Sequence, residues 1–281
     1  MRGAVCGEPP SAGGDTAEEV VAHGVPVETG EAVGQLGDGA VIEEGHHAVG
    51  VQQQLLRVVE AGLPGGEGGG DVHHMEQQVI GLVLVLDQVA RGGADGGAVA
   101  ADGSVESAIN LAIARRLEAL AGLFGVETVM TRESEDIDYP EEADTVSKMK
   151  QAAQNARVKL INSVPDGVLI SIHQNYYPDS RPSGAQVLYA ATDGSQELGE
   201  LAHAAITSAL CPDSRRVAAP ISRDIFLMRS VKCPAILAEC GFISNAGELE
   251  KLRSGTYQTK LAALLLTSYL QYRSAAETMR V

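Results

Sequence analysis

The chain has 281 residues, a formal net charge of −16 and a mean hydropathy close to zero. This acidic balance argues against a nucleic-acid partner, and no apolar run is long enough to form a transmembrane segment. The first residues contain no apolar stretch of the signal-peptide type, so no signal peptide is visible.

Residues 1–82 differ in composition from the rest of the chain, because they contain no Lys, Asn, Phe or Tyr. Residues 1–90 hold 18 of the 32 glycines and carry 14 acidic residues against two Arg. Such a segment buries too little apolar surface to offset its chain entropy. We therefore predict that 1–82 is either disordered or not the natural N-terminus, as an upstream frame or assembly error would produce. Histidine pairs at 46–47 and 73–74 lack a periodic scaffold, and we do not expect a metal site there.

From residue 83 onward, short apolar runs alternate with amphipathic helical patterns. In chain order, we expect strands at 82–86, 126–130, 168–172, 186–190, 224–229 and 234–238, and helices at 106–124, 148–161, 196–210, 245–252 and 257–272. This alternation predicts a single α/β domain over 83–275, with a mostly parallel twisted sheet and helices on both faces. Residues 276–281 are expected to form a tail.

Three polar residues lie at the ends of these predicted elements, namely Glu106, His173 and Glu239. Each has a simple structural explanation: Glu106 as a first-turn acid favoured by the helix dipole, His173 as the end of a strand, and Glu239 as a surface carboxylate. Taken together, they suggest a catalytic zinc site at the carboxyl ends of the strands. Such a site uses three protein ligands and a water, with a separate carboxylate to transfer the proton.

The chain resembles the zinc-dependent N-acetylmuramoyl-L-alanine amidases of the amidase-3 family over about residues 82–273. Seven stretches carry the resemblance in order: GGADGGA (92–98), ESAINLAIARRLE (106–118), ETVMTR (127–132), ARVKLIN (156–162), LISIHQN (169–175), SGAQVLY (183–189) and PAILAECGFISN (234–245). SIHQN followed by SGAQV is most similar to the sporulation-type subgroup of spore-forming bacteria. The resemblance implies a peptidoglycan hydrolase that cleaves the amide between N-acetylmuramic acid and L-alanine, outside the cytoplasm at the cell envelope.

The resemblance also implies roles for individual residues. Glu106 and His173 fall on two ligands of the family's Zn²⁺, and Glu239 falls on the catalytic glutamate, expected to act as general base. Arg157 and Asn175 lie in matched motifs without an assigned role. His203 lies in a predicted helix, and we expect it at the surface rather than in catalysis.

One ligand position departs from the family. The first ligand histidine belongs to a motif of the form Asp-Pro-Gly-His-Gly-Gly, whereas this chain has Asp87-Gln-Val-Ala-Arg91-Gly-Gly. Arg91 occupies the histidine position, and a permanently protonated guanidinium cannot coordinate zinc. Two protein ligands remain as the chain is written, and rescue by His73 or His74 is not expected. We predict that the loss of the histidine belongs to the same upstream error.

Two further functions stay open. One is a catalytically inactive relative that binds peptidoglycan or regulates its turnover, which the arginine at position 91 would fit. The other is a different α/β zinc hydrolase, such as a carboxypeptidase, although the stretch PAILAECGFISN favours the amidase. The sequence identifies no protein partner.

Overall fold

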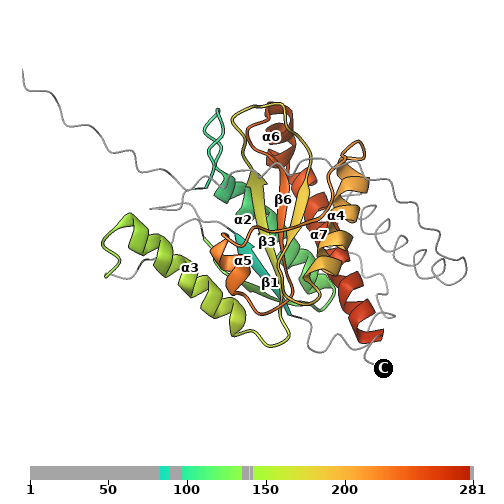
Figure 1. Ribbon diagram of the computed structural model, residues 1–281. Coiled ribbons are helices and arrows are strands. Elements are labelled where there is room, and N and C mark those ends of the chain that lie inside the picture. Colours follow the sequence, from blue (N-terminus) through green and yellow to red (C-terminus); the bar gives the residue numbers. More distant parts are fainter. Residues whose placement is uncertain (1–82, 89–96, 135–138, 140–141, 279–281) are drawn as a thin grey trace, which may run out of the picture. The chain divides into compact units, whose positions relative to one another are not determined.

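The computed structural model describes residues 83–88, 97–134, 139 and 142–278 (Figure 1). The predictions for residues 1–82, including both histidine pairs, and for Arg91 lie outside these described residues. The elements are, in chain order, β1 (Val83–Gln88), α2 (Glu106–Leu123), β2 (Glu127–Met130), α3 (Val146–Asn162), β3 (Val168–Asn175), β4 (Gln186–Tyr189), α4 (Ser195–Leu210), β5 (Ala219–Pro220), α5 (Phe226–Ser230), β6 (Ala235–Phe242), α6 (Ala246–Arg253) and α7 (Gly255–Thr278).

The strands form one six-stranded sheet in the order β2-β1-β3-β6-β4-β5. All neighbouring pairs are parallel except β4, which runs antiparallel to β6. The prediction of a mostly parallel sheet is therefore confirmed. β3 and β6 are the two central strands, and the burial of nearly all their residues matches a sheet that is covered on both faces.

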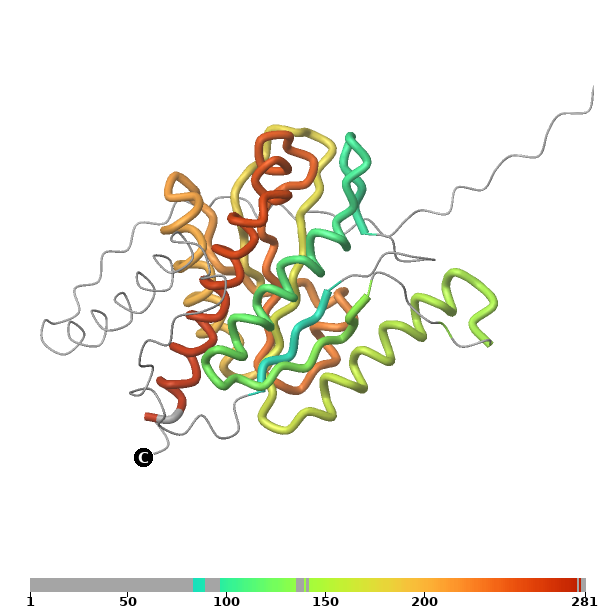
Figure 2. Tube along the Cα trace, turned by 180° about the vertical axis from the view of Figure 1, so that it is seen from behind, coloured from blue at the N-terminus to red at the C-terminus, as the bar shows by residue number. Residues whose placement is uncertain are grey.

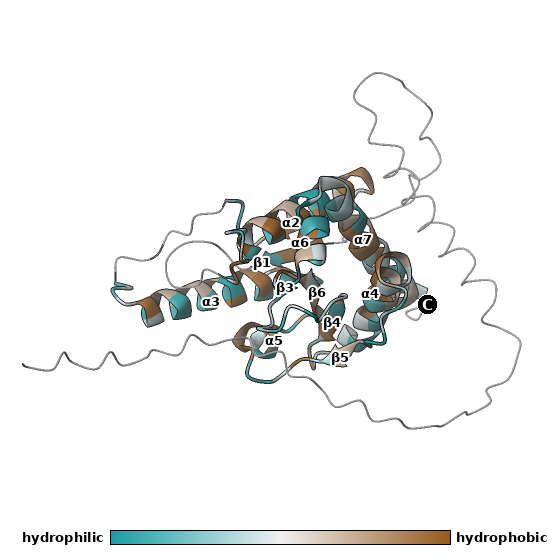
Figure 3. Ribbon diagram, turned by 90° about the horizontal axis from the view of Figure 1, so that it is seen from above, coloured by the Kyte–Doolittle hydropathy of each residue, from teal (hydrophilic) through white to brown (hydrophobic). Residues whose placement is uncertain are grey.

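Helices cover both faces of the sheet, as the sequence predicted. Seen from above, α3 and α5 lie on one side, and α2, α4 and α7 lie on the other (Figure 3). Alternation along the strands divides their side chains between these two layers. Ile170, for example, belongs to the core beneath α2, α4 and α7, whereas Leu169 belongs to the core beneath α3 and α5.

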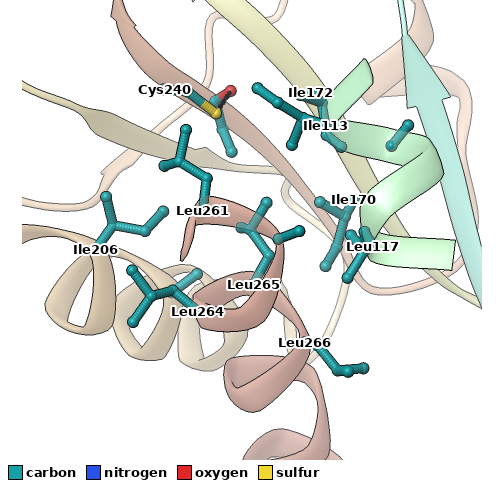
Figure 4. Close-up of a cluster of buried hydrophobic side chains, with 14 of the residues drawn as sticks. Ile113, Leu117, Ile170, Ile172, Ile206, Cys240, Leu261, Leu264, Leu265 and Leu266 are labelled. Atoms are coloured by element: carbon teal, nitrogen blue, oxygen red, sulfur yellow. Dashed lines mark hydrogen bonds between the residues drawn. The ribbon is translucent and has the colours of Figure 1, made fainter. Parts of the chain in front are cut away.

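The larger core lies between the sheet and the layer of α2, α4 and α7. α2 and α7 run side by side on this face (Figure 2). Leu261 and Leu265 of α7 and Ile113 of α2 lie close to Ile170 and Ile172 of β3 (Figure 4). This packing fixes the position of α2 against β3, and therefore the position of the first residue of α2 relative to the end of β3. Within the described part of the chain, no helix is long and apolar enough to span a membrane.

The structure corrects several details of the sequence interpretation. The predicted tail at 276–281 begins later, because α7 continues to Thr278. The predicted short strand at 224–229 is wrong, because this segment forms the helix α5, which buries Leu227 and Met228. β6 does not end at Ala238 but continues through Phe242, because it pairs with β3 on one side and β4 on the other. His203 is not at the surface: it is buried in α4, and its Nε2 lies 2.8 Å from the carbonyl oxygen of Arg216.

Candidate active site

The structure brings Glu106, His173 and Glu239 together at the carboxyl ends of the central strands. His173 and Glu239 are direct partners in the parallel register of β3 and β6, so their side chains share one face of the sheet. Glu106 is the first residue of α2, and its Oε1 lies 3.3 Å from Nδ1 of His173. The register of β3 and β6 shifts immediately beyond this point, between His173 and Asn175. Ligands of open α/β sheets bind at this end of the strands.

Glu106 is held in place by several hydrogen bonds. The backbone N–H of Ala98 donates to Oε2 at 2.9 Å, while the Nδ2 of Asn110 and the backbone N–H of Gln174 donate to Oε1 at 3.1 and 3.2 Å. Gly97 adopts a φ of +63°, and a Cβ at this position would lie 2.9 Å from Oε2 of Glu106. A glycine is therefore required where the loop passes over the carboxylate.

These contacts set the charge state of the Glu106–His173 pair. Burial alone would raise the pKa of Glu106, but its hydrogen bond to His173, the charge of that imidazole and two backbone N–H groups hold the pKa below its usual value. Burial alone would likewise lower the pKa of His173, but the hydrogen bond to Glu106 and the negative charges nearby raise it. Each partner therefore stabilises the charged form of the other.

Glu239 lies in a different environment although it is only one strand away. Its side chain is buried, and among the described residues Oε2 has no hydrogen-bond partner. Burial raises the pKa of Glu239 to about 7, and the opposing charge of His173 does not cancel this effect. A carboxyl group that titrates near neutral pH can both accept and release a proton there. The sequence alone left open a surface carboxylate, and the structure excludes that explanation.

The polar groups next to Nε2 of His173 were not predicted from the sequence. Nε2 of His173 lies 3.1 Å from Oγ of Ser171, and Ser171 donates to Oδ2 of Asp87 at 2.9 Å. Asp87 is fully buried and also accepts from Oγ1 of Thr131 at 2.8 Å and from Nη1 of Arg157 at 3.5 Å. Arg157, which had no assigned role, thus contacts the carboxylate at the end of β1. The spacing of Ser171 and His173, two residues apart on one strand, was the available signal.

Asn175, the other residue without an assigned role, contributes through its backbone. Its carbonyl oxygen accepts a hydrogen bond of 2.8 Å from the N–H of Ile243, just beyond the end of β6. Asn175 also pairs with Phe242 where the register of β3 and β6 resumes after the shift. These contacts tie the ends of the two strands together next to the site.

Two donor atoms of the site have the spacing that a zinc ion requires of its ligands. Bonds of 2.0–2.1 Å in a tetrahedral site place two ligand atoms roughly 3.3 Å apart. Nδ1 of His173 and Oε1 of Glu106 are separated by 3.3 Å, and a neutral imidazole and a carboxylate are both zinc ligands. These two residues fit the metal. Within the described residues, however, no group of three His, Cys, Asp or Glu side chains could hold a metal ion, so the set is one ligand short.

A cleft of about 580 Å³ opens between the loop that precedes α2 and the helix α6. Its lining includes Asp102 and Arg253, whose side chains form an ion pair at 2.7 Å, and Ile243 and Ser244 just beyond the end of β6. None of Glu106, His173 and Glu239 lines it. The cleft therefore lies beside the three residues rather than around them.

Comparison with known proteins identifies one family. The family model described as N-acetylmuramoyl-L-alanine amidase, Amidase_3, matches residues 85–268. The germination-specific N-acetylmuramoyl-L-alanine amidase of Bacillus subtilis strain 168 is 34% identical over 193 residues, which cover 68% of this chain and 80% of that protein. The N-acetylmuramoyl-L-alanine amidase LytC of the same strain is 25% identical over 203 residues, 71% of this chain but 37% of LytC.

Solved structures give the same result. The CwlD amidase from Clostridioides difficile, solved in complex with the GerS lipoprotein, superposes with a TM-score of 0.65 at 29% identity, covering 69% of this chain and 99% of that chain. An N-acetylmuramoyl-L-alanine amidase from Clostridium difficile 630 superposes with a TM-score of 0.58 at 26% identity, covering 69% and 98%. In both cases nearly the whole of the solved chain has a counterpart here.

Proposed function

Because the chain belongs to the Amidase_3 family of N-acetylmuramoyl-L-alanine amidases, we propose that it hydrolyses the amide bond between N-acetylmuramic acid and the L-alanine of the peptidoglycan stem peptide. The observation that carries the proposal is the meeting of Glu106, His173 and Glu239 at the carboxyl ends of β3 and β6. One half of this arrangement is a charged, hydrogen-bonded pair, and the other half is a buried carboxyl group whose Oε2 has no hydrogen-bond partner within the described part of the chain.

In this proposal Glu106 and His173 are zinc ligands, and Glu239 is the proton carrier. Bound zinc would supply Lewis-acid chemistry, polarising the scissile carbonyl and lowering the pKa of the attacking water. Oε2 of Glu239 takes the proton from the water and passes it to the leaving amide nitrogen. The pKa of about 7 supports this role, because the same group must gain and then lose a proton at neutral pH.

The relatives support a role in the cell wall of a spore-forming bacterium. The Bacillus subtilis relative is named for germination, and the sequence similarity of SIHQN and SGAQV is to the sporulation-type subgroup. We propose peptidoglycan outside the cytoplasmic membrane as the substrate.

A second function is favoured by one specific observation, the arginine at the first ligand position of the family motif. Arg91 lies outside the described residues, so the argument rests on the sequence alone. A site with two protein ligands and a nearby cation would hold zinc weakly. The chain as written would then be a peptidoglycan-binding or regulatory relative without turnover.

The chain as written and its Arg91→His variant distinguish the two functions. We expect the variant to retain close to one zinc per chain after dialysis and to release stem peptides from purified peptidoglycan. The chain as written, which is one ligand short, should retain little zinc and release few stem peptides. Arg223→His, a change at an exposed arginine in the loop before α5, is the matched control and should behave like the written chain. If Arg91→His binds zinc and peptidoglycan but releases no stem peptide, the hydrolase proposal is wrong and the binding function stands.

A further inference from the structure

We propose that Ser171 and Asp87 are positioning residues that favour the tautomer of His173 with the hydrogen on Nε2, so that the lone pair of Nδ1 is available to a metal. The inference rests on the proposed function, because it concerns the ring nitrogen that would meet the metal. The residues involved lie on the inner strands β1 and β3 and are fully buried.

The direction of the hydrogen bonds follows from the number of hydrogens available. A serine hydroxyl carries one hydrogen, and Ser171 donates it to Oδ2 of Asp87 at 2.9 Å. Toward Nε2 of His173, 3.1 Å away, Oγ of Ser171 can therefore only accept. A hydrogen bond between Nε2 and Oγ therefore requires the hydrogen on Nε2, and in a neutral imidazole this leaves Nδ1 as the nitrogen with the free lone pair.

Asp87 fixes the direction of the hydrogen bond that it forms with Ser171. A carboxylate has no hydrogen to donate, so it can only accept from Ser171. It also accepts from Thr131 at 2.8 Å and is paired with Arg157 at 3.5 Å, and these contacts hold it in its orientation. These contacts favour the hydrogen bond from Ser171 to Asp87 over one from Ser171 to His173.

The opposite tautomer has its own stabilising contact, which makes the arrangement a competition. Oε1 of Glu106 lies 3.3 Å from Nδ1 of His173 and would accept a hydrogen from it. In that tautomer Nδ1 would have no lone pair to offer to a metal. The contact of Ser171 with Nε2, supported by Asp87, opposes that tautomer. Outer hydrogen-bond partners of this kind orient histidine ligands in metal sites and change metal affinity by about 10–100-fold.

The sheet itself builds the chain of contacts. Asp87 and Ser171 are direct register partners on the parallel strands β1 and β3, and Ser171 and His173 are two residues apart on β3. All three side chains therefore leave the same face of the sheet. A shift in the register of either strand would break this chain of contacts.

The tautomer can be measured directly in zinc-free protein. Nitrogen-15 NMR of the histidine rings at alkaline pH, where the imidazole is neutral, distinguishes hydrogen on Nε2 from hydrogen on Nδ1. The resonances of His173 are assigned by their absence in His173→Gln. We expect hydrogen on Nε2 in the parent and a shift toward Nδ1 in Ser171→Ala, which removes the acceptor.

Two further variants complete the test. Asp87→Asn should also shift His173 toward hydrogen on Nδ1, because an amide can donate to Ser171 and free its hydroxyl to donate to Nε2. Ser268→Ala removes an equally buried hydroxyl in α7, where it donates to the carbonyl of Leu264, and should leave the tautomer unchanged. Hydrogen on Nδ1 in the parent, or an unchanged tautomer in Ser171→Ala, would overturn the inference.

Zinc affinity separates this inference from the proposed function. In the Arg91→His background, we expect Ser171→Ala to weaken zinc binding about 10–100-fold in competition with a chelator, and Ser268→Ala to leave it unchanged. If the background protein binds no zinc, the proposed metal site fails while the NMR result still decides the tautomer. If zinc binds but Ser171→Ala changes neither affinity nor tautomer, the proposed function survives and the positioning role is wrong.

Discussion

Glu106 at the start of α2 and Glu239 near the end of β6 are both buried beside His173, yet their polar surroundings are opposite. Glu106 receives hydrogen bonds from two backbone N–H groups and one side-chain amide and is paired with the imidazole. Among the described residues, Oε2 of Glu239 receives none. The pKa of Glu106 is consequently held below its usual value, whereas the pKa of Glu239 is raised to about 7.

Burial alone therefore does not decide what a carboxyl group can do. A carboxylate surrounded by donors remains charged, and a permanently charged oxygen suits a metal ligand. A carboxyl group buried without donors keeps its proton more readily, and a group near its pKa suits proton transfer. Two glutamates on neighbouring elements can therefore divide these tasks, as we propose for this site.

The largest expected effect comes from removing the proton carrier. In the Arg91→His background, Glu239→Gln should lower the rate of stem-peptide release by about 10²–10⁴-fold, because the amide cannot accept the proton of the water. Zinc content should stay the same. Glu250→Gln, at an exposed position of α6, is the control and should retain the parent rate. A rate within a few-fold of the parent in Glu239→Gln would remove the catalytic role of Glu239.

The same carboxyl group should lower the stability of the zinc-free protein at high pH. Because the folded-state pKa of about 7 exceeds the usual 4.5, the folded state binds the proton more tightly than the unfolded state. The favourable contribution is complete below pH 4.5 and is lost as the pH rises through 7, by up to about 3 kcal/mol.

Melting temperatures of Glu239→Gln and its parent, measured against pH with a chelator present, test this sign. The neutral glutamine should make the variant more stable than the parent above pH 7, and the two proteins should converge at acidic pH. Equal melting temperatures over the whole range would show that Glu239 is not buried in the way described.

Removing the charge of Glu106 should weaken zinc binding. Glu106→Gln in the Arg91→His background should weaken zinc binding by about 100-fold or more, since losing a ligand should exceed the 10–100-fold effect of an outer partner. The amide would also bring its own donors toward the donors of Ala98 and Asn110. Competition with a chelator measures the effect, and unchanged affinity would exclude Glu106 as a ligand.

A smaller effect on zinc affinity is expected from Asn110, which contacts Glu106. Asn110 is fully buried, donates to Glu106 and accepts from Nε2 of Gln174 at 3.1 Å. Asn110→Ala leaves that amide without its acceptor and should lower the free energy of unfolding by about 1–3 kcal/mol. Zinc affinity should fall by about 10-fold. Chemical denaturation with and without zinc separates the two contributions, and a loss of stability without a loss of affinity would limit Asn110 to a structural role.

The sequence predicted the elements whose apolar pattern is clear. β3 was found as a short continuous apolar run and α2 from apolar residues at helical spacing, and this placed His173 and Glu106 at the ends of elements. The short helix α5 was taken for a strand, because five residues are too few to show a helical period. The length of β6 depends on its pairing with β3 and β4, and the sequence of β6 alone does not reveal that pairing.

The environment of the site could not be predicted from the sequence. The alternative that Glu239 lies at the surface was removed only by its burial between β3 and β4. The contact of Ser171 with Asp87 joins residues 84 positions apart and depends on the register of β1 and β3. The roles of Glu106, His173 and Glu239 as ligands and base stay predictions, as does the effect of Arg91.

The most direct test of the central claim is the titration of the two carboxyl groups in zinc-free protein. Carbon-13 NMR of the glutamate side chains, assigned with Glu106→Gln and Glu239→Gln, gives the pKa of each group. We expect Glu106 to titrate below its ordinary 4.5 and Glu239 at about 7. Midpoints that coincide, or a Glu239 that titrates below Glu106, would contradict the division of tasks between the two glutamates.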